Sequence, residues 1–158
     1  MLDFLEKEEA VSPALLRELQ AYREANPLAD ALRPRIPRPR YHYYGREIWE
    51  QAIAALLCGP AWNVSFHVSM DAASLIGMDT FEGGEVRFRP GPVYQCARCG
   101  GFGILDEINM AKNEALAVLH SALDFRRAID VPGYERIDMA EPTRFIATMN
   151  YGYAGTRE

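Results

Sequence analysis

The chain has 158 residues, of which 49% are hydrophobic and 25% are charged, ordinary values for a globular protein that exclude disorder along the whole chain. Its net charge of −5 argues against binding nucleic acid through a general electrostatic attraction. No apolar run reaches the roughly 18 residues that a membrane span needs, and the acidic N-terminus lacks a signal-peptide pattern. Three cysteines, an odd number, argue against a secreted disulfide framework, so we expect a cytoplasmic protein with no nucleic-acid or membrane partner.

Residues 1–40 are predicted to form an N-terminal helical segment followed by a linker rich in proline and arginine. The alternation of charged and apolar positions in residues 1–26 favours an amphipathic helix, or a helix pair that breaks near Ser12 and Pro13. Residues 33–40 hold four Arg and three Pro, a composition that favours an extended connector. A local contact with an anion is the alternative for this Arg-rich stretch.

Helices and strands are predicted to alternate through residues 41–158. The expected elements are helices at 45–58, 71–77 and 110–127, strands at 62–68, 101–106 and 144–149, a short strand or hairpin arm at 85–89, and a hairpin at 128–139. In the first of these helices, Ile48, Ala52, Ala55 and Leu56 form one apolar stripe. Such alternation is typical of an α/β fold with a parallel sheet.

Polar side chains follow two of the apolar strands. Asp106 and Glu107 come at the end of the strand 101–106, and Asn150 follows the strand 144–149. Ligands of parallel sheets bind at the carboxyl ends of the strands. There, one carboxylate can hold Mg²⁺, the second can polarise an attacking water, and the amide can contact that water or a phosphate. Capping of a helix by the acids and a turn at the asparagine are the structural alternatives.

The ordered series of motifs resembles the AAA+ ATPases, and within them the MoxR-like group of the dynein-related branch. GFGILDEINMA is similar to the Walker B segment, which implies that Asp106 is the metal-binding acid and Glu107 the catalytic acid. RFIATMN is similar to the sensor 1 strand, which implies that Asn150 is the sensor. The arms around VPGYERI resemble the hairpin that precedes sensor 1 in this group.

The resemblance extends over residues 41–158, which we therefore expect to form a partial AAA+ core domain. Tyr44 and Gly45 look like the entry segment that covers the adenine, so the resemblance assigns them to nucleotide binding. It also implies a P-loop NTPase fold of three αβα layers, ATP and Mg²⁺ as cofactors, and ATP hydrolysis coupled to chaperone-like protein remodelling. The partners that it implies are a protein substrate or a von Willebrand A domain, and further copies of the chain in a hexamer.

Two segments of the family pattern are missing from the sequence. After a helix like 45–58 the family has a strand and a phosphate loop with Gly-Lys, known as Walker A, but here the chain runs directly into 62–68. Neither of the two lysines, Lys7 and Lys112, follows a glycine as such a loop requires. No segment like the arginine finger or the C-terminal lid follows sensor 1.

We therefore expect a truncated sheet that lacks strands 1 and 5, has the order 4-3-2 and leaves the strand 144–149 at an uncovered edge. ATP hydrolysis is then expected to be impaired. The alternative is a non-catalytic interaction module, or a truncated or internally deleted fragment of such an ATPase. Cys96 and Cys99 form a single CxxC pair, too few ligands for a structural zinc site, and are expected to be ordinary thiols near the turn before the strand 101–106.

Overall fold

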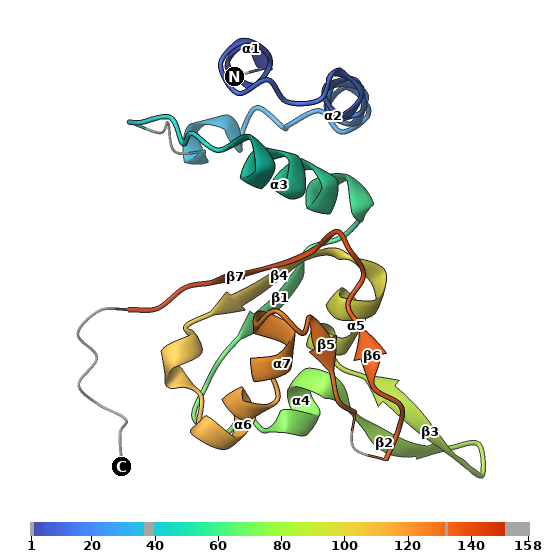
Figure 1. Cartoon of the computed structure of the whole chain (residues 1–158). Helices are drawn as coiled ribbons and strands as arrows, with labels where there is room; N and C mark the ends of the chain where they lie inside the picture. Colours follow the sequence, from blue (N-terminus) through green and yellow to red (C-terminus); the bar gives the residue numbers. More distant parts are fainter. Residues whose placement is uncertain (1, 37–39, 132, 151–158) are drawn as a thin grey trace. The chain divides into compact units, whose positions relative to one another are not determined.

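The computed structural model describes residues 2–36, 40–131 and 133–150, and the chain divides into two compact units (Figure 1). Unit 1 comprises Met1–Leu57 and unit 2 comprises Cys58–Glu158. The predicted assignment of residues 1–40 and 41–158 to two segments places the boundary earlier than this division. The difference is helix α3, Arg46–Cys58, nearly all of which belongs to unit 1.

Unit 1 is built from helices around a small apolar core. Helix α1 spans Leu2–Lys7 and α2 spans Pro13–Ala25, which confirms the predicted helix pair and its break. Pro13 begins α2, where its missing N–H removes no helical hydrogen bond. The apolar cluster at the centre of this unit comprises the buried residues Phe4, Leu5, Val11, Leu19 and Ile53.

The predicted extended connector is wrong at its start, because Arg33–Arg35 form the short 3₁₀ helix η1. Proline suits the first turn of a helix, and here Pro34 lies in that turn. Arg33 also donates from Nε to Asp30 Oδ1 at 2.9 Å. Residues 37–39 lie outside the described residues, so the rest of this prediction is not assessed.

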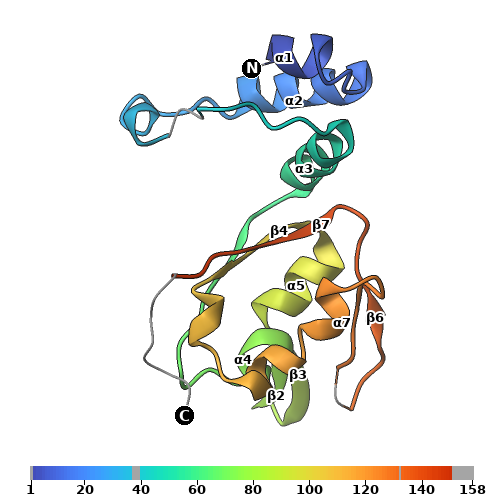
Figure 2. The same cartoon turned by 60° about the vertical axis from the view of Figure 1, so that its left-hand side comes forward.

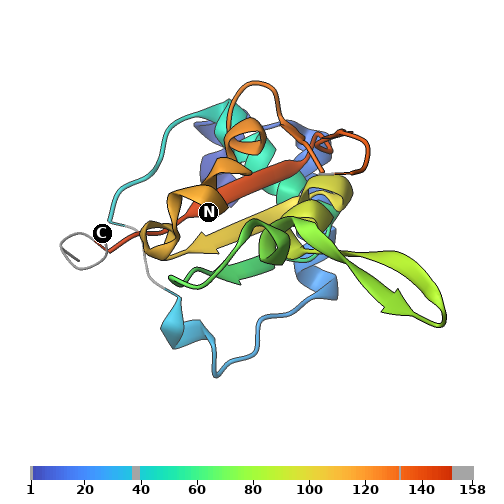
Figure 3. The same ribbon diagram turned by 90° about the horizontal axis from the view of Figure 1, so that it is seen from below.

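Unit 2 contains a parallel sheet of three strands. Strand β1 (Trp62–Ser65) pairs with β4 (Gly101–Asp106), which pairs with β7 (Thr143–Ala147). Figure 3 shows the three strands side by side. The structure thus confirms the α/β fold, the parallel sheet and the predicted order, with β7 at one edge. Among the described residues, no strand pairs with the outer side of β7.

Two antiparallel hairpins extend from this sheet domain. Strands β2 (Gly77–Glu82) and β3 (Glu85–Pro90) form the longer hairpin, which reaches away from the sheet in Figure 3. Only β3 was predicted from the sequence. Strands β5 (Ala128–Ile129) and β6 (Ile137–Asp138) form the second hairpin, as predicted.

Short helices complete unit 2 and lie on one face of the sheet (Figures 1 and 2). They are α4 (Ala72–Ile76), α5 (Pro92–Cys99), η2 (Ile108–Met110), α6 (Asn113–Ala117) and α7 (His120–Leu123). Asp71 caps α4, because its carboxylate accepts from the backbone N–H of Ser74 at 2.8 Å. This hydrogen bonding with Ser74 lowers the pKa of the Asp71 carboxyl.

The predicted single helix at 110–127 is wrong. The chain forms η2 and two separate short helices, and it leaves the helical conformation at Asp124, whose ψ is −173°. The Asp124 carboxylate accepts hydrogen bonds from the backbone N–H and the guanidinium of Arg126. Arg127 then has a φ of 43° and donates to the carbonyls of Ala140 and Glu141, both at 3.2 Å. The local bonds of Asp124 and the longer-range bonds of Arg127 stabilise a turn in place of a continued helix.

The core of unit 2 lies between the sheet and these helices. Its fully buried members include Phe66, Leu75, Leu105, Leu119 and Ile129. None of the helices described for residues 2–36, 40–131 and 133–150 is long and apolar enough to cross a membrane.

Candidate functional site

The carboxyl ends of β4 and β7 bring polar residues together at one edge of the sheet. Asp106 is the last residue of β4 and Glu107 follows it, while Thr148 and Asn150 follow β7. Because the two strands pair in parallel, the residues that follow them emerge on the same side. The structure therefore places Asp106, Glu107 and Asn150 close together, as the sequence predicted.

Hydrogen bonds link these four residues in series, with the backbone N–H of Glu107 as one of the donors. The Thr148 hydroxyl donates to Asp106 Oδ1, and the oxygen of that hydroxyl, Oγ1, accepts from the backbone N–H of Glu107 at 3.1 Å. The Asn150 side-chain amide donates from Nδ2 to Glu107 Oε1 at 3.0 Å. The two neighbouring carboxylates thus have different partners, Thr148 for the first and Asn150 for the second.

The backbone of Glu107 separates the two carboxylates. Its φ of 55° and ψ of 43° place it in the left-handed region, which costs a residue other than glycine about 1–2 kcal/mol. Strain of this kind often collects at functional sites. It reverses the direction of the chain directly after β4, so that Asp106 and Glu107 do not alternate as neighbours in a strand do.

Backbone hydrogen bonds hold this edge on both sides. The N–H of Thr148 donates to Leu105 O at 2.9 Å, and its carbonyl accepts from the N–H of Ile108 at 3.1 Å. On the other side of β4, Phe66 N donates to Asp106 O at 2.9 Å. The turn after β4 is therefore fixed by the chain segments that follow β1 and β7.

The oxygen atoms at this edge are suited to a hard cation such as Mg²⁺. Asp106 supplies a carboxylate, and the described residues contain no group of three or more His, Cys, Asp or Glu side chains that could hold a metal alone. Mg²⁺ in proteins is commonly bound by one or two carboxylates together with water and substrate phosphates. The residues present fit Mg²⁺ that is held jointly with a nucleotide.

Thr148 is the member of this cluster that the sequence reasoning missed. A threonine within an apolar, β-branched run is typical of a strand, so its hydroxyl drew no attention. The available signal was its position. It lies one residue beyond Ala147, the last residue of β7, and two residues before Asn150.

Tyr44 and Gly45, predicted to bind nucleotide, belong to unit 1 and have partners there. The backbone N–H of Gly45 donates to Glu9 Oε2 at 2.7 Å, and the Tyr44 hydroxyl donates to Glu8 Oε2 at 3.4 Å. The Tyr44 ring also meets the Phe4 ring edge-on, with centroids 5.5 Å apart. These contacts attach the start of α3 to α1, and the role in nucleotide binding stays a prediction.

The CxxC pair lies in the last turn of α5, which ends at Cys99 shortly before β4, in agreement with the predicted position near the turn before that strand. Cys96 is fully buried and Cys99 is exposed. Burial raises the pKa of the Cys96 thiol to about 12. A neutral, buried thiol of this kind packs as a small apolar group.

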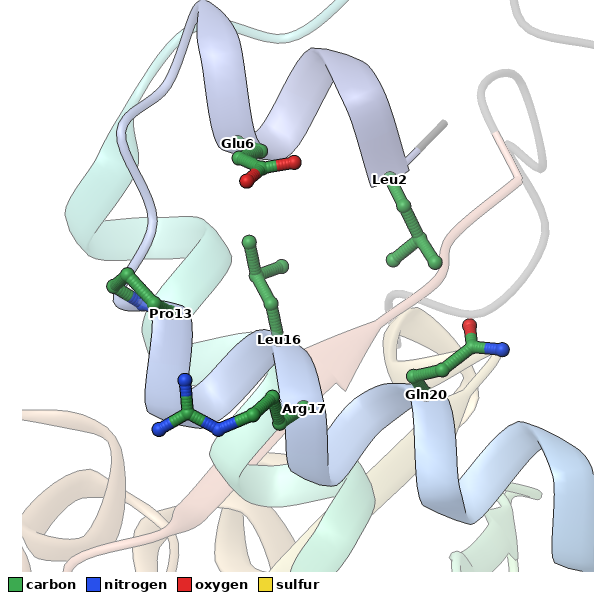
Figure 4. Close-up of a pocket in the computed structure, with 6 residues that line it drawn as sticks. All are labelled: Leu2, Glu6, Pro13, Leu16, Arg17 and Gln20. Carbon is green, nitrogen blue, oxygen red and sulfur yellow. The ribbon is translucent and has the colours of Figure 1, made fainter.

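A separate hollow of about 250 Å³ lies between α1 and α2 in unit 1 (Figure 4). Glu6 and Arg17 are the charged residues in its lining, and Leu2 and Leu16 supply apolar surface. None of the predicted site residues lines it. Three of the predicted site residues, Asp106, Glu107 and Asn150, lie instead in the polar cluster of unit 2.

Comparisons with known proteins identify the family of the chain. A family model described as an AAA domain of the dynein-related subfamily matches residues 45–158. The uncharacterized proteins SH1500 of Staphylococcus haemolyticus and SAB1265c of Staphylococcus aureus are 36% and 35% identical to this chain over 118 residues. Each alignment covers 71% of this chain and 45% of the relative, so the chain spans less than half the length of these relatives.

A crystal structure of a protein from Cytophaga hutchinsonii, provisionally named an ATPase, has a similar fold. Its TM-score is 0.52 at 17% sequence identity, and the match covers 70% of this chain and 32% of that one. At this identity the likeness concerns the fold alone. The family match, by contrast, includes both strands of the site and extends over more than half of the sequence. The chain therefore belongs to the AAA domain family, in its dynein-related subfamily.

Proposed function

We propose that this chain is a MoxR-like AAA+ module that binds Mg²⁺ and ATP at the carboxyl edge of β4 and β7. The observation that carries the proposal is the hydrogen-bonded chain from Asp106 through Thr148 and Glu107 to Asn150. It combines a carboxylate for a cation, a second carboxylate for a water, and an amide donor. These are three of the groups that take part in phosphoryl transfer to water.

Each side chain has a distinct role in this proposal. Asp106 supplies a carboxylate oxygen to Mg²⁺, which when bound neutralises negative charge on the phosphates. Glu107 accepts a hydrogen bond from the attacking water and polarises it as a general base. Asn150, which donates to Glu107 in this structure, orients the carboxylate and can also donate to a terminal phosphate oxygen.

The missing phosphate loop sets the limit of this activity. Three residues, 59–61, separate α3 from β1, and no lysine lies between Lys7 and Lys112. A Gly-Lys loop normally supplies backbone N–H groups and a positive charge to the phosphates. We therefore expect weak nucleotide binding and a turnover far below that of a complete site.

Coupling to protein remodelling is a further part of the proposal, and membership of the family supports it. The partners are then a protein substrate or a von Willebrand A domain, and the assembly is a hexamer of this chain. Sedimentation of the full chain with and without Mg²⁺ and ATP tests the assembly. A single monomeric species at both conditions would contradict it.

Thermal unfolding of the full chain with and without Mg²⁺ and ATP tests the proposed binding. A ligand at 100 times its dissociation constant adds about 2.7 kcal/mol, which moves the midpoint of a small domain by several degrees. We expect a smaller upward shift at millimolar ATP that is absent in Asp106→Ala. A cooperative transition with no shift, or the same shift in the variant, would contradict the proposal.

The exposed edge of β7 supports a second candidate, a non-catalytic interaction module. Ile146 and Met149 are 49% and 58% exposed, and edge strands with apolar side chains readily pair with another chain. The two candidates differ in one measurement. Both modules unfold cooperatively. The unfolding temperature of an interaction module is the same with and without ATP, whereas that of the nucleotide-binding module rises when ATP is added.

A further inference from the structure

Thr148 contacts four consecutive residues on the neighbouring strand and the turn that follows it. Its backbone is hydrogen-bonded to Leu105 and Ile108, and its hydroxyl to Asp106 and Glu107. The backbone bonds are available to any residue at this position. The two hydroxyl bonds are specific to a side chain that can donate and accept at the same oxygen.

We propose that Thr148 is a positioning residue that sets the directions of both carboxylates through its hydroxyl group. This inference rests on the proposed function for its significance, since it concerns the same site. The hydroxyl orients Asp106 by donating to Oδ1, and it satisfies the Glu107 N–H at the point where the backbone is left-handed.

The choice of threonine fits this role. A β-branched side chain has few χ1 rotamers, so the hydroxyl is held in one direction without further contacts. Valine has nearly the same shape but neither donates nor accepts a hydrogen bond. Serine keeps the hydroxyl and loses only the methyl group. The pair of variants Thr148→Val and Thr148→Ser therefore separates the hydroxyl from the shape of the side chain.

The effect should reach Asn150 through Glu107. If the Glu107 N–H loses its acceptor, the left-handed conformation loses a bond that stabilises it, and the side chain no longer meets Asn150 Nδ2 at 3.0 Å. A residue that only tied the two strands together would leave this pair unchanged. The Asn150 side-chain amide is therefore a spectroscopic reporter of the positioning role.

Amide hydrogen exchange and NMR spectra of the ¹⁵N-labelled full chain test the proposal without any nucleotide. In Thr148→Val we expect the Glu107 amide to exchange about fivefold faster, the factor that corresponds to one hydrogen bond, and the Asn150 side-chain resonances to move. In Thr148→Ser we expect the wild-type exchange rate of the Glu107 amide and the wild-type Asn150 resonances. Thr80→Val is the matched control, because the exposed Thr80 hydroxyl donates to Arg87 O in the distant β2–β3 hairpin.

Two results would overturn the proposal. The first is a folded Thr148→Val protein with unchanged Glu107 exchange and Asn150 resonances. The second is the same change in Thr148→Val and Thr148→Ser, which would show that the hydroxyl is not responsible. If Thr148→Val does not fold, Thr148→Ala provides the variant without a hydroxyl and is judged by the same criteria.

Titration with MnCl₂ and ATP tests whether Thr148 affects binding of the metal and the nucleotide. Paramagnetic Mn²⁺ should broaden the Asp106 and Glu107 resonances of the wild-type chain at a lower concentration than in Thr148→Val, with Thr148→Ser close to wild type. The inference would be overturned if the resonances of wild type and Thr148→Val broadened at the same Mn²⁺ concentration. Absence of broadening in the wild type would contradict the proposed function, while Glu107 exchange would still decide the role of Thr148.

Discussion

Glu107 adopts a left-handed backbone conformation at the residue where the two carboxylates of the site diverge. Residues other than glycine are disfavoured in this conformation, and backbone strain of this kind often occurs at functional sites, which supports the proposed role of the Glu107 carboxylate. Thr148 and Asn150 accept and donate the hydrogen bonds that this conformation makes available. At the residue scale, the site combines local strain with bonds that offset it.

Glycine and alanine at position 107 measure this strain directly. Both variants remove the carboxylate, but only glycine occupies the left-handed region without steric cost. We expect Glu107→Gly to be more stable than Glu107→Ala by about 1 kcal/mol in urea unfolding. Equal stability of the two variants would show that the residue is not held in this conformation in solution.

The buried thiol of Cys96 gives a second test at this scale. Burial raises its pKa from 9.0 to about 12, so the folded chain keeps a proton that the unfolded chain releases. The stability from this group is complete below pH 9 and is lost as the pH rises towards 12. At pH 8 we expect a thiol reagent to label Cys58 and Cys99 rapidly and Cys96 slowly, with Cys96→Ala as control. Rapid labelling of all three would be inconsistent with the buried position.

Strand β4 approaches β7 closely because residue 103 has no side chain. A Cβ built at Gly103 would lie 2.3 Å from the Phe145 ring and 3.1 Å from Cys96 Sγ. We expect Gly103→Ala to lower the free energy of unfolding by about 1–3 kcal/mol, the usual cost of overpacking. The double variant Gly103→Ala, Phe145→Leu should recover part of the loss. If the single substitution were neutral, the strands would not pack as described.

The elements that the sequence predicted are those whose residues carry their own local signal. Strands β1, β4 and β7 have continuous or alternating apolar character, and Asp71 and Gly77 mark the two ends of α4. Strand β2, by contrast, was not predicted, and the Gly83-Gly84 pair directly follows it. Only pairing with β3 across the Gly83-Gly84 turn gives it a regular structure.

Other errors arose where tertiary contacts decide the outcome. Helix α5 was not predicted, although Pro92, its first residue, is well suited to the first turn of a helix. Within the apolar stripe of α3, Ala55 is buried but Ile48 is 53% exposed. Helical periodicity predicts which residues share a face of the helix, but not which of them another element covers. For the site, the types and positions of three residues were predictable, whereas the hydroxyl of Thr148 depended on the register of β4 and β7.

The whole molecule consists of two units, each with its own buried apolar cluster. The polar cluster lies entirely in unit 2, and the family match extends from residue 45 to residue 158. The curated relatives are about twice as long as the part that aligns with this chain. The central claim of the proposed function is therefore one about unit 2, that Mg²⁺ and ATP bind where β4 and β7 end.

Titration of the ¹⁵N-labelled full chain with ATP and Mg²⁺, followed by NMR, tests that claim most directly. We predict concentration-dependent shifts that are largest for the amides of Asp106, Glu107, Thr148 and Asn150 and that disappear in Asp106→Ala. Titration with Mg²⁺ alone should give much smaller shifts, because the described residues hold too few ligands to bind the ion without phosphates. Unchanged resonances for these four residues at millimolar Mg²⁺ and ATP would contradict the account.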